Sequence, residues 1–172
     1  AMIYLDYAAT TPVDERVLAK MMPYFRENYG NPSSIHRLGQ KAEAAVDEAR
    51  EKVASVLGCR ADEIIFTSGG SEADNLALRG AMLANKESTK WILTAKTEHP
   101  AVSKTAIQLE NEYGFLLEWL DVNEHGAVTV ESLSKAVCNN TTMASVMYAN
   151  NEIGTINPVA NLAEVAKANN IL

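Results

Sequence analysis

The chain has 172 residues; 47% of them are hydrophobic, and 15 basic against 22 acidic side chains give a formal net charge of −7. A chain of this length can form one domain with a core, and because its charges are interspersed, neither nucleic acid nor an anionic membrane surface is expected as a partner. No apolar run could span a bilayer, no signal peptide is visible, and the two cysteines form no C-x-x-C motif, so a reducing, cytoplasmic location is expected.

The first residues predict a short strand followed by a helix. Residues 3–6 have the character of a strand, and Pro12 favours the start of a helix that runs to about Arg26. Pro23 should kink or end this helix, because proline lacks an amide hydrogen and its ring clashes with the preceding turn.

A loop of turn-forming residues, 28–34, leads to the clearest helix of the chain. Ser34 is its predicted N-cap, and Gly58 should end it. Between them, apolar residues recur at intervals of three and four positions, which is the spacing of one helix face. These positions are Ala42, Ala45, Val46, Ala49, Val53, Val56 and Leu57.

The rest of the sequence alternates between predicted strands and helices. The strands are expected at 64–68, 91–95, 115–122 and 143–149, and the helices that follow them at 71–84, 100–112, 130–137 and 159–168. Repeated strand–helix units with continuous apolar strands predict an α/β fold, a mostly parallel sheet with helices on both faces. Ile171 and Leu172 look like the start of a further strand, so the sheet is expected to be incomplete at the carboxyl terminus.

The turn Ser68–Ser71 contains two glycines and precedes a predicted helix. Unpaired amides at the start of a helix favour an anion, and the Ser71 hydroxyl could add a further donor to a phosphate. No lysine follows the glycines and no G-x-G-x-x-G is present, so neither a nucleotide P-loop nor a dinucleotide fingerprint fits. The alternative is an ordinary turn in which a serine caps the helix.

Two further polar segments, Thr97–His99 and Asn150–Glu152, also follow predicted strands. Because ligands of such sheets bind at the carboxyl ends of the strands, the three segments could converge on one crevice. His99 is the candidate acid or base, since imidazole exchanges protons near neutral pH; otherwise it simply flanks the helix that begins at Pro100. Asn151 could donate to a ligand oxygen or could merely form a turn.

The other histidines and the cysteines carry no predicted chemistry. His36 and His125 are interpreted as structural or surface residues, and the histidines are too scattered for a metal site. No cysteine and histidine have zinc-ligand spacing. Cys59 and Cys138 lie beside none of the polar segments and are interpreted as structural.

Five segments together resemble the NifS/IscS-type cysteine desulfurases, which are pyridoxal-phosphate (PLP) enzymes of fold type I in the class V aminotransferase family. The segments lie in the family's order at residues 4–12, 30–36, 66–77, 97–99 and 150–155. The resemblance implies the amino-terminal half of such an enzyme. Residues 1–12 would then belong to its small domain, and residues 13–172 to a truncated PLP-binding large domain.

The resemblance also implies roles for particular residues. Gly70 and Ser71 match positions that bind the cofactor phosphate, in place of the commoner Ala-Thr. His99 matches a histidine that stacks on the pyridine ring and takes part in proton transfer. Asn151 matches an asparagine that hydrogen-bonds the phenolic oxygen of PLP.

The implied activity is conversion of L-cysteine to L-alanine, with the sulfur left on an enzyme cysteine as a persulfide. The family's Schiff-base lysine and persulfide cysteine would lie after Leu172, so these 172 residues alone are expected to be inactive. Implied partners are a second copy in a homodimer and a sulfur acceptor, either an iron–sulfur scaffold or a tRNA-thiolation relay. Two alternatives remain: another class V enzyme, such as a selenocysteine lyase or an aminotransferase, and a non-catalytic or split subunit that needs a second polypeptide.

Overall fold

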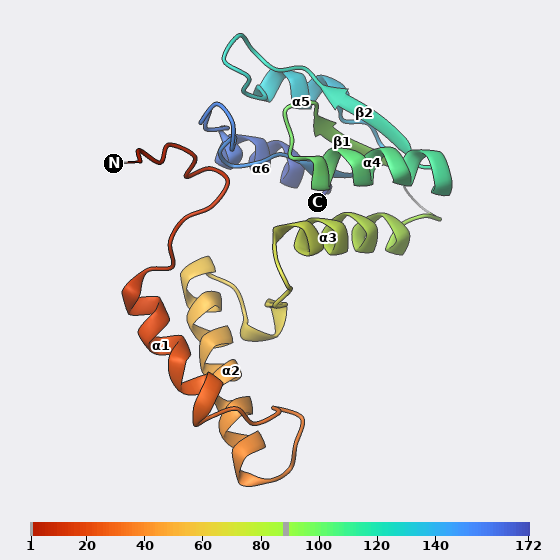
Figure 1. The fold of residues 1–172 in the computed structure, drawn as a ribbon. Coiled ribbons are helices and arrows are strands. Elements are labelled where there is room, and N and C mark those ends of the chain that lie inside the picture. Colours follow the sequence, from red (N-terminus) through yellow and green to blue (C-terminus); the bar gives the residue numbers. More distant parts are fainter. Residues whose placement is uncertain (1, 88–89) are drawn as a thin grey trace. The chain divides into compact units, whose positions relative to one another are not determined.

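The computed structural model describes residues 2–87 and 90–172, and Figure 1 traces the chain through them. The chain divides into two compact units, Ala1–Phe66 and Thr67–Leu172. In the described part of the chain, no helix is both long enough and apolar enough to cross a membrane.

The unit Ala1–Phe66 contains helix α1 (Glu15–Arg26). The helix begins after Asp14 and not at Pro12, because an Asp14 carboxylate oxygen accepts the Arg16 amide at 2.8 Å and so caps the first turn. Pro23 lies inside α1 and does not end it. The expected strand at 3–6 does not form, since these residues pair with no strand in the described chain.

Helix α2 (Arg37–Leu57) is the longest of the same unit. His36 caps it, because its Nδ1 accepts the Gly39 amide at 3.3 Å, and the prediction of Ser34 as the cap is therefore wrong. The interpretation of His36 as a structural residue is confirmed. Gly58 ends α2 as predicted, with the left-handed φ of 68° that glycine tolerates best. A short 3₁₀ turn, η1 (Ala61–Glu63), follows.

The unit Thr67–Leu172 is an α/β layer structure built on three parallel strands. The order of the strands in the sheet is β2-β1-β3, with β1 in the centre. In chain order the elements are α3 (Gly70–Ala84), β1 (Trp91–Ala95), α4 (Pro100–Tyr113), β2 (Leu116–Leu120), α5 (Val130–Ala136), β3 (Thr141–Ser145) and α6 (Val159–Ala168).

Of the strands expected at 64–68, 91–95, 115–122 and 143–149, two have different bounds and one is absent. The strand expected at 115–122 is shorter, and the one expected at 143–149 begins and ends earlier, because the chain after Ser145 turns into an irregular loop. Residues 64–68 form no strand, since no described strand pairs with their backbone. The four helices predicted after the strands are all present.

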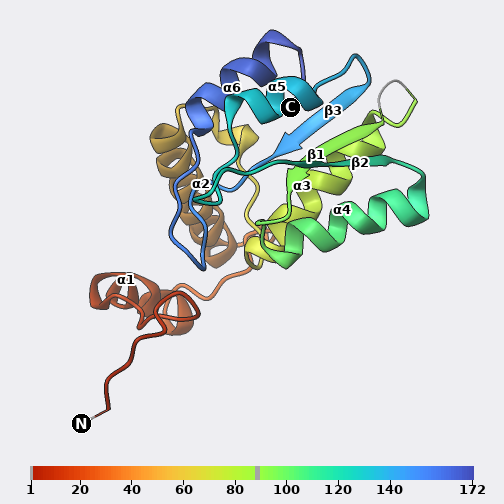
Figure 2. The ribbon, with the colours of Figure 1, turned by 90° about the horizontal axis from the view of Figure 1, so that it is seen from above.

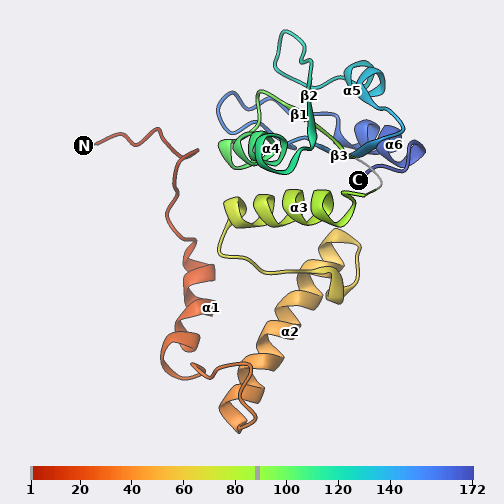
Figure 3. The same ribbon diagram turned by 90° about the vertical axis from the view of Figure 1, so that its right-hand side faces the viewer.

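Helices cover both faces of the sheet, as predicted (Figures 2 and 3). Ile92 packs in one apolar cluster with side chains of α3 and α4, whereas the next residue, Leu93, packs in a second cluster with Leu133 of α5 and Leu162 of α6. Consecutive side chains of a strand point to opposite faces, so a strand with two apolar faces must be covered on both.

The outer edge of β3 is paired by the last residue of the chain. The Leu172 amide donates to the Thr142 carbonyl at 3.1 Å, and the Leu172 carbonyl accepts the Ala144 amide at 2.8 Å. One residue that bonds to positions two apart on its neighbour is the pattern of a parallel ladder. Leu172 therefore pairs with β3, whereas the Ile171 amide still donates to the Ala166 carbonyl of α6.

Candidate functional site

The sheet has a topological switch point between β1 and β3. The connection through α4 leads from β1 to a strand on one side of it, and the connection through α5 leads back to β3 on the other side. In open α/β sheets, ligands bind outside the carboxyl ends of the strands at such a point. Figures 1 and 2 show the first turns of α3 and α4 and the loop after β3 at this one end of the sheet.

The start of α3 offers free backbone donors. The first amide of the helix with a backbone acceptor is that of Ala73, which donates to Gly69 O at 3.1 Å. In the described chain, the amides of Gly70, Ser71 and Glu72 have no acceptor, and a side chain added at Gly69 or Gly70 would meet no atom within 4 Å. This open helix start can receive an anion.

The turn before α3 is held by Glu72. One carboxylate oxygen of Glu72 accepts both the Ser68 amide at 2.7 Å and the Ser68 hydroxyl at 2.6 Å, which lowers the pKa of Glu72. Ser71 is exposed and is the second residue of the helix, whose N-cap is Gly69. The alternative in which a serine caps the helix is therefore wrong, and the exposed Ser71 hydroxyl is available to a ligand.

His99 caps α4 and keeps one ring nitrogen available. Its Nδ1 accepts the Ala101 amide at 3.0 Å, and Pro100 occupies the first helical position, where no amide is needed. Since Nδ1 acts as an acceptor, the proton of the neutral imidazole is on Nε2. The side chain is exposed, so the Nε2–H can donate a hydrogen bond to a ligand, whereas protonation of the ring would require Nδ1 to release the Ala101 amide.

Asn151 and Asn150 have different surroundings. Asn151 is exposed, and its Nδ2 donates to the neighbouring Glu152 carboxylate at 2.9 Å. Asn150 is buried, and its Oδ1 accepts the amides of Glu152 and Ile153 at 2.9 and 3.0 Å. The turn-forming role thus belongs to Asn150, and Asn151 remains accessible to a ligand.

Glu98 and Asn150 are polar residues that the sequence analysis named only as parts of segments. The Asn150 Nδ2 donates to the Thr97 carbonyl at 2.8 Å, and a Glu98 carboxylate oxygen accepts the Met147 amide at 2.6 Å. Burial raises the pKa of Glu98; the Met147 amide opposes this effect, and Asp74 of α3 adds to it. The sequence contained one signal for both residues: each is a charged or amide side chain directly before a predicted site residue.

The structure thus links the segments that carry His99 and Asn151 directly. It links α3, which carries Ser71, to these segments through its contact with α4. The turn that carries His99 and the loop that carries Asn151 are joined by hydrogen bonds. The second turns of α3 and α4 are connected, because Thr105 Oγ1 donates to Asn75 Oδ1 at 2.9 Å. Among the described residues, Ser71, His99 and Asn151 share no direct hydrogen bond with each other.

The described residues contain no group of three or more His, Cys, Asp or Glu that could hold a metal ion. Cys59 and Cys138 are free and exposed, and His125 is exposed beside Glu124. The donors at the switch point are amides, a hydroxyl, an imidazole and a carboxamide. Such a set fits an organic group with an anionic tail and a ring oxygen better than a metal.

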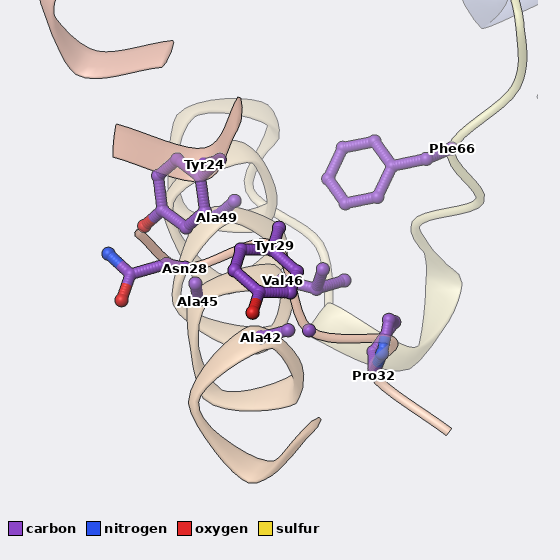
Figure 4. Close-up of a pocket in the computed structure, with 10 residues that line it drawn as sticks. Tyr24, Asn28, Tyr29, Pro32, Ala42, Ala45, Val46, Ala49 and Phe66 are labelled. Carbon is purple, nitrogen blue, oxygen red and sulfur yellow. The ribbon is translucent and has the colours of Figure 1, made fainter. Parts of the chain in front are cut away.

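A separate cavity of about 440 Å³ lies within the unit Ala1–Phe66 (Figure 4). Tyr24, Tyr29 and Phe66 surround small residues of α2 there, and the Arg50 guanidinium carbon lies 5.1 Å from the centre of the Phe66 ring. None of the predicted site residues lines this cavity. Its mainly apolar wall does not suit a charged cofactor.

A model of the class V aminotransferase family matches residues 3–172 of the chain. The putative cysteine desulfurase IscS 1 of Bacillus subtilis (strain 168) is 48% identical over 165 residues, which cover 96% of this chain and 43% of that protein. The cysteine desulfurase IscS of Clostridium botulinum (strain Kyoto / Type A2) is 48% identical over 169 residues, or 98% of this chain and 42% of that protein.

Solved structures of related proteins also match this chain over nearly its whole length. A NifS-like protein superimposes with a TM-score of 0.91 at 40% identity, over 98% of this chain and 46% of its own. SspA in complex with cysteine superimposes with a TM-score of 0.92 at 36% identity, over 98% of this chain and 48% of its own. The chain therefore spans less than half the length of the relatives that it matches.

Proposed function

Because this chain belongs to the class V aminotransferase family, we propose that it is the PLP-binding part of a cysteine desulfurase. The reaction is the conversion of L-cysteine to L-alanine, with the sulfur retained as a persulfide on an enzyme cysteine. The observation that supports the proposal most directly is that the first turns of α3 and α4 and the loop after β3 lie at the same end of the sheet, with the last two segments joined by hydrogen bonds. The identity of 48% to named cysteine desulfurases supports it.

In this proposal the cofactor phosphate binds at the start of α3. The amides of Gly70 and Ser71 and the Ser71 hydroxyl donate to it, and the helix dipole favours its negative charge. Asn151 would donate to the phenolic oxygen, and His99 would lie against the ring. When bound, PLP supplies an electron sink for the substrate.

His99 is also the proposed acid–base group. In the neutral ring Nε2 already carries the proton and Nδ1 accepts the Ala101 amide, so His99 would take up a proton at Nδ1, with release of that amide, and could then donate one from Nε2. The hydrogen bond to Nδ1 fixes the ring plane at the start of α4. While the cap is in place, the backbone therefore orients the Nε2–H of this side chain.

The substrate, partners and domain assignment belong to the same proposal. L-cysteine as the substrate is supported by the relative SspA, which was solved in complex with cysteine. We infer a cytoplasmic homodimer that passes sulfur to an acceptor protein in iron–sulfur cluster formation or tRNA thiolation. Residues 1–12 would belong to the small domain, and residues 13–172 to the large domain.

The 172-residue chain alone should form no covalent adduct with PLP and should not release alanine from cysteine. By the family resemblance, the lysine that binds PLP lies after Leu172, and no lysine of this chain matches it. The measurement is borohydride reduction of the chain with PLP, followed by mass spectrometry. A specific, reducible lysine adduct together with full turnover would contradict this assignment.

Substitution of Ser71 by alanine should weaken PLP binding by about 10- to 100-fold in the holoenzyme, which is the range for one hydrogen bond to a charged group. PLP affinity can be measured by equilibrium dialysis. Ser134→Ala is the matched control, because Ser134 is an exposed serine of α5. If both variants hold PLP as tightly as the unmodified enzyme, Ser71 does not bind the phosphate.

A further inference from the structure

Two buried polar side chains join the turn after β1 to the loop after β3, in opposite directions. Glu98 belongs to the turn and accepts the amide of Met147 in the loop at 2.6 Å. Asn150 belongs to the loop and donates to the carbonyl of Thr97 in the turn at 2.8 Å. Each segment thus uses one side chain to bind the backbone of the other.

Both side chains are buried, and each directly precedes an exposed candidate site residue. Glu98 is 9% exposed and Asn150 is 8% exposed, whereas their neighbours His99 and Asn151 face solvent. A buried carboxylate or amide is costly unless its hydrogen bonds are made. The two bonds therefore fix their segments against each other.

The loop that receives these bonds is itself internally braced. The Asn150 amide donates to Thr155 O at 2.8 Å, and the Asn157 amide donates to Tyr148 O at 2.9 Å. Buried Asn157 also donates from Nδ2 to Met147 O at 2.8 Å. Because the loop is closed on itself, a bond that holds Met147 also holds Asn151.

We propose that Glu98 and Asn150 form a reciprocal clamp that positions His99 and Asn151 relative to each other at the cofactor site. The two clamp residues are positioning residues and not catalytic ones, since each acts through the backbone of the opposite segment. This inference rests on the proposed function for its consequence at the cofactor. The physical linkage of the two segments can be tested without PLP.

The chain offers variants that separate the clamp from other effects. Glu98→Ala removes the acceptor of the Met147 amide, whereas Glu98→Gln keeps an acceptor oxygen in the same place. Asn150→Asp removes the donor to Thr97 but keeps the oxygen that accepts the amides of Glu152 and Ile153. The glutamine variant is the matched control for the other two.

Amide hydrogen exchange followed by NMR on the 172-residue chain tests the linkage. In Glu98→Ala and Asn150→Asp, exchange of the Met147 amide should accelerate about 10- to 100-fold, the range for loss of a buried hydrogen bond. The amides of β1 should be unchanged, which excludes global unfolding. Glu98→Gln should behave like the unmodified chain, and an unchanged Met147 amide in Glu98→Ala would overturn the clamp.

PLP affinity of the holoenzyme tests the consequence. It should fall at least about 10-fold in Glu98→Ala and Asn150→Asp and remain unchanged in Glu98→Gln. Loosened segments with unchanged PLP affinity in all three variants would overturn the positioning role. If the unmodified enzyme binds no PLP but exchange follows the expected pattern, the proposed function fails while the linkage of the two segments is supported.

Discussion

Gly39→Ala should destabilise the unit Ala1–Phe66 by about 3 kcal/mol or more. The added methyl group would collide with backbone atoms, which cannot rotate away as a flexible side chain can. A methyl group at Gly39 would overlap the Ser34 carbonyl and would lie 2.8 Å from the Asn31 carbonyl oxygen. A methyl group at Gly30 would likewise overlap the Leu38 carbonyl. The loop and the first turn of α2 therefore approach each other through two glycines.

Urea unfolding followed by far-UV circular dichroism measures this effect. Gly80→Ala is the matched control, because Gly80 lies inside α3 and a methyl group there would meet no atom within 4 Å. Alanine is the better helix former, so this control should stabilise the protein by up to about 1 kcal/mol. Equal stability of Gly39→Ala and the unmodified chain would show that the loop moves aside freely.

Leu93→Ala should destabilise the unit Thr67–Leu172 by about 3–5 kcal/mol, which is the range for leucine truncation in a rigid core. Leu93 is completely buried in the central strand and packs with Leu120, Leu133 and Leu162. Helices cover both faces of the sheet, so the surrounding structure cannot easily collapse into the cavity.

Fluorescence of Trp91 and Trp119 during denaturation reports on this unit. Leu116→Ala in β2 provides the matched control, because Leu116 is 42% exposed and should lose less than about 1 kcal/mol. A loss at Leu93 as small as that at Leu116 would mean that the core around β1 is not close-packed.

The helices of the second unit were predictable because their signals are local. His99 and Pro100 start α4, and Gly114 ends it in the left-handed conformation. Each signal depends on the bonding capacity or backbone freedom of one residue and needs no distant partner. The same logic failed at Ser34, where the histidine two residues later forms the cap instead.

Strands were harder to predict, because a strand requires a neighbour. Residues 91–95 were predicted correctly, and they form the central strand with a partner on each side. Residues 64–68 are similarly apolar but pair with no described strand, so their composition does not produce one. Apolar character indicates that a segment can be buried in a sheet, but the register and the partner come from elsewhere in the chain.

The sequence alone determined the class of fold, the helix boundaries set by local caps, and the kinds of chemical groups that follow the strands. Only the tertiary structure decided that the ends of β1 and β3 are adjacent, and that Glu98 and Asn150 are buried there while His99 and Asn151 are exposed. The reason is that hydrogen bonds between residues about 50 positions apart depend on the strand order, which no local pattern specifies.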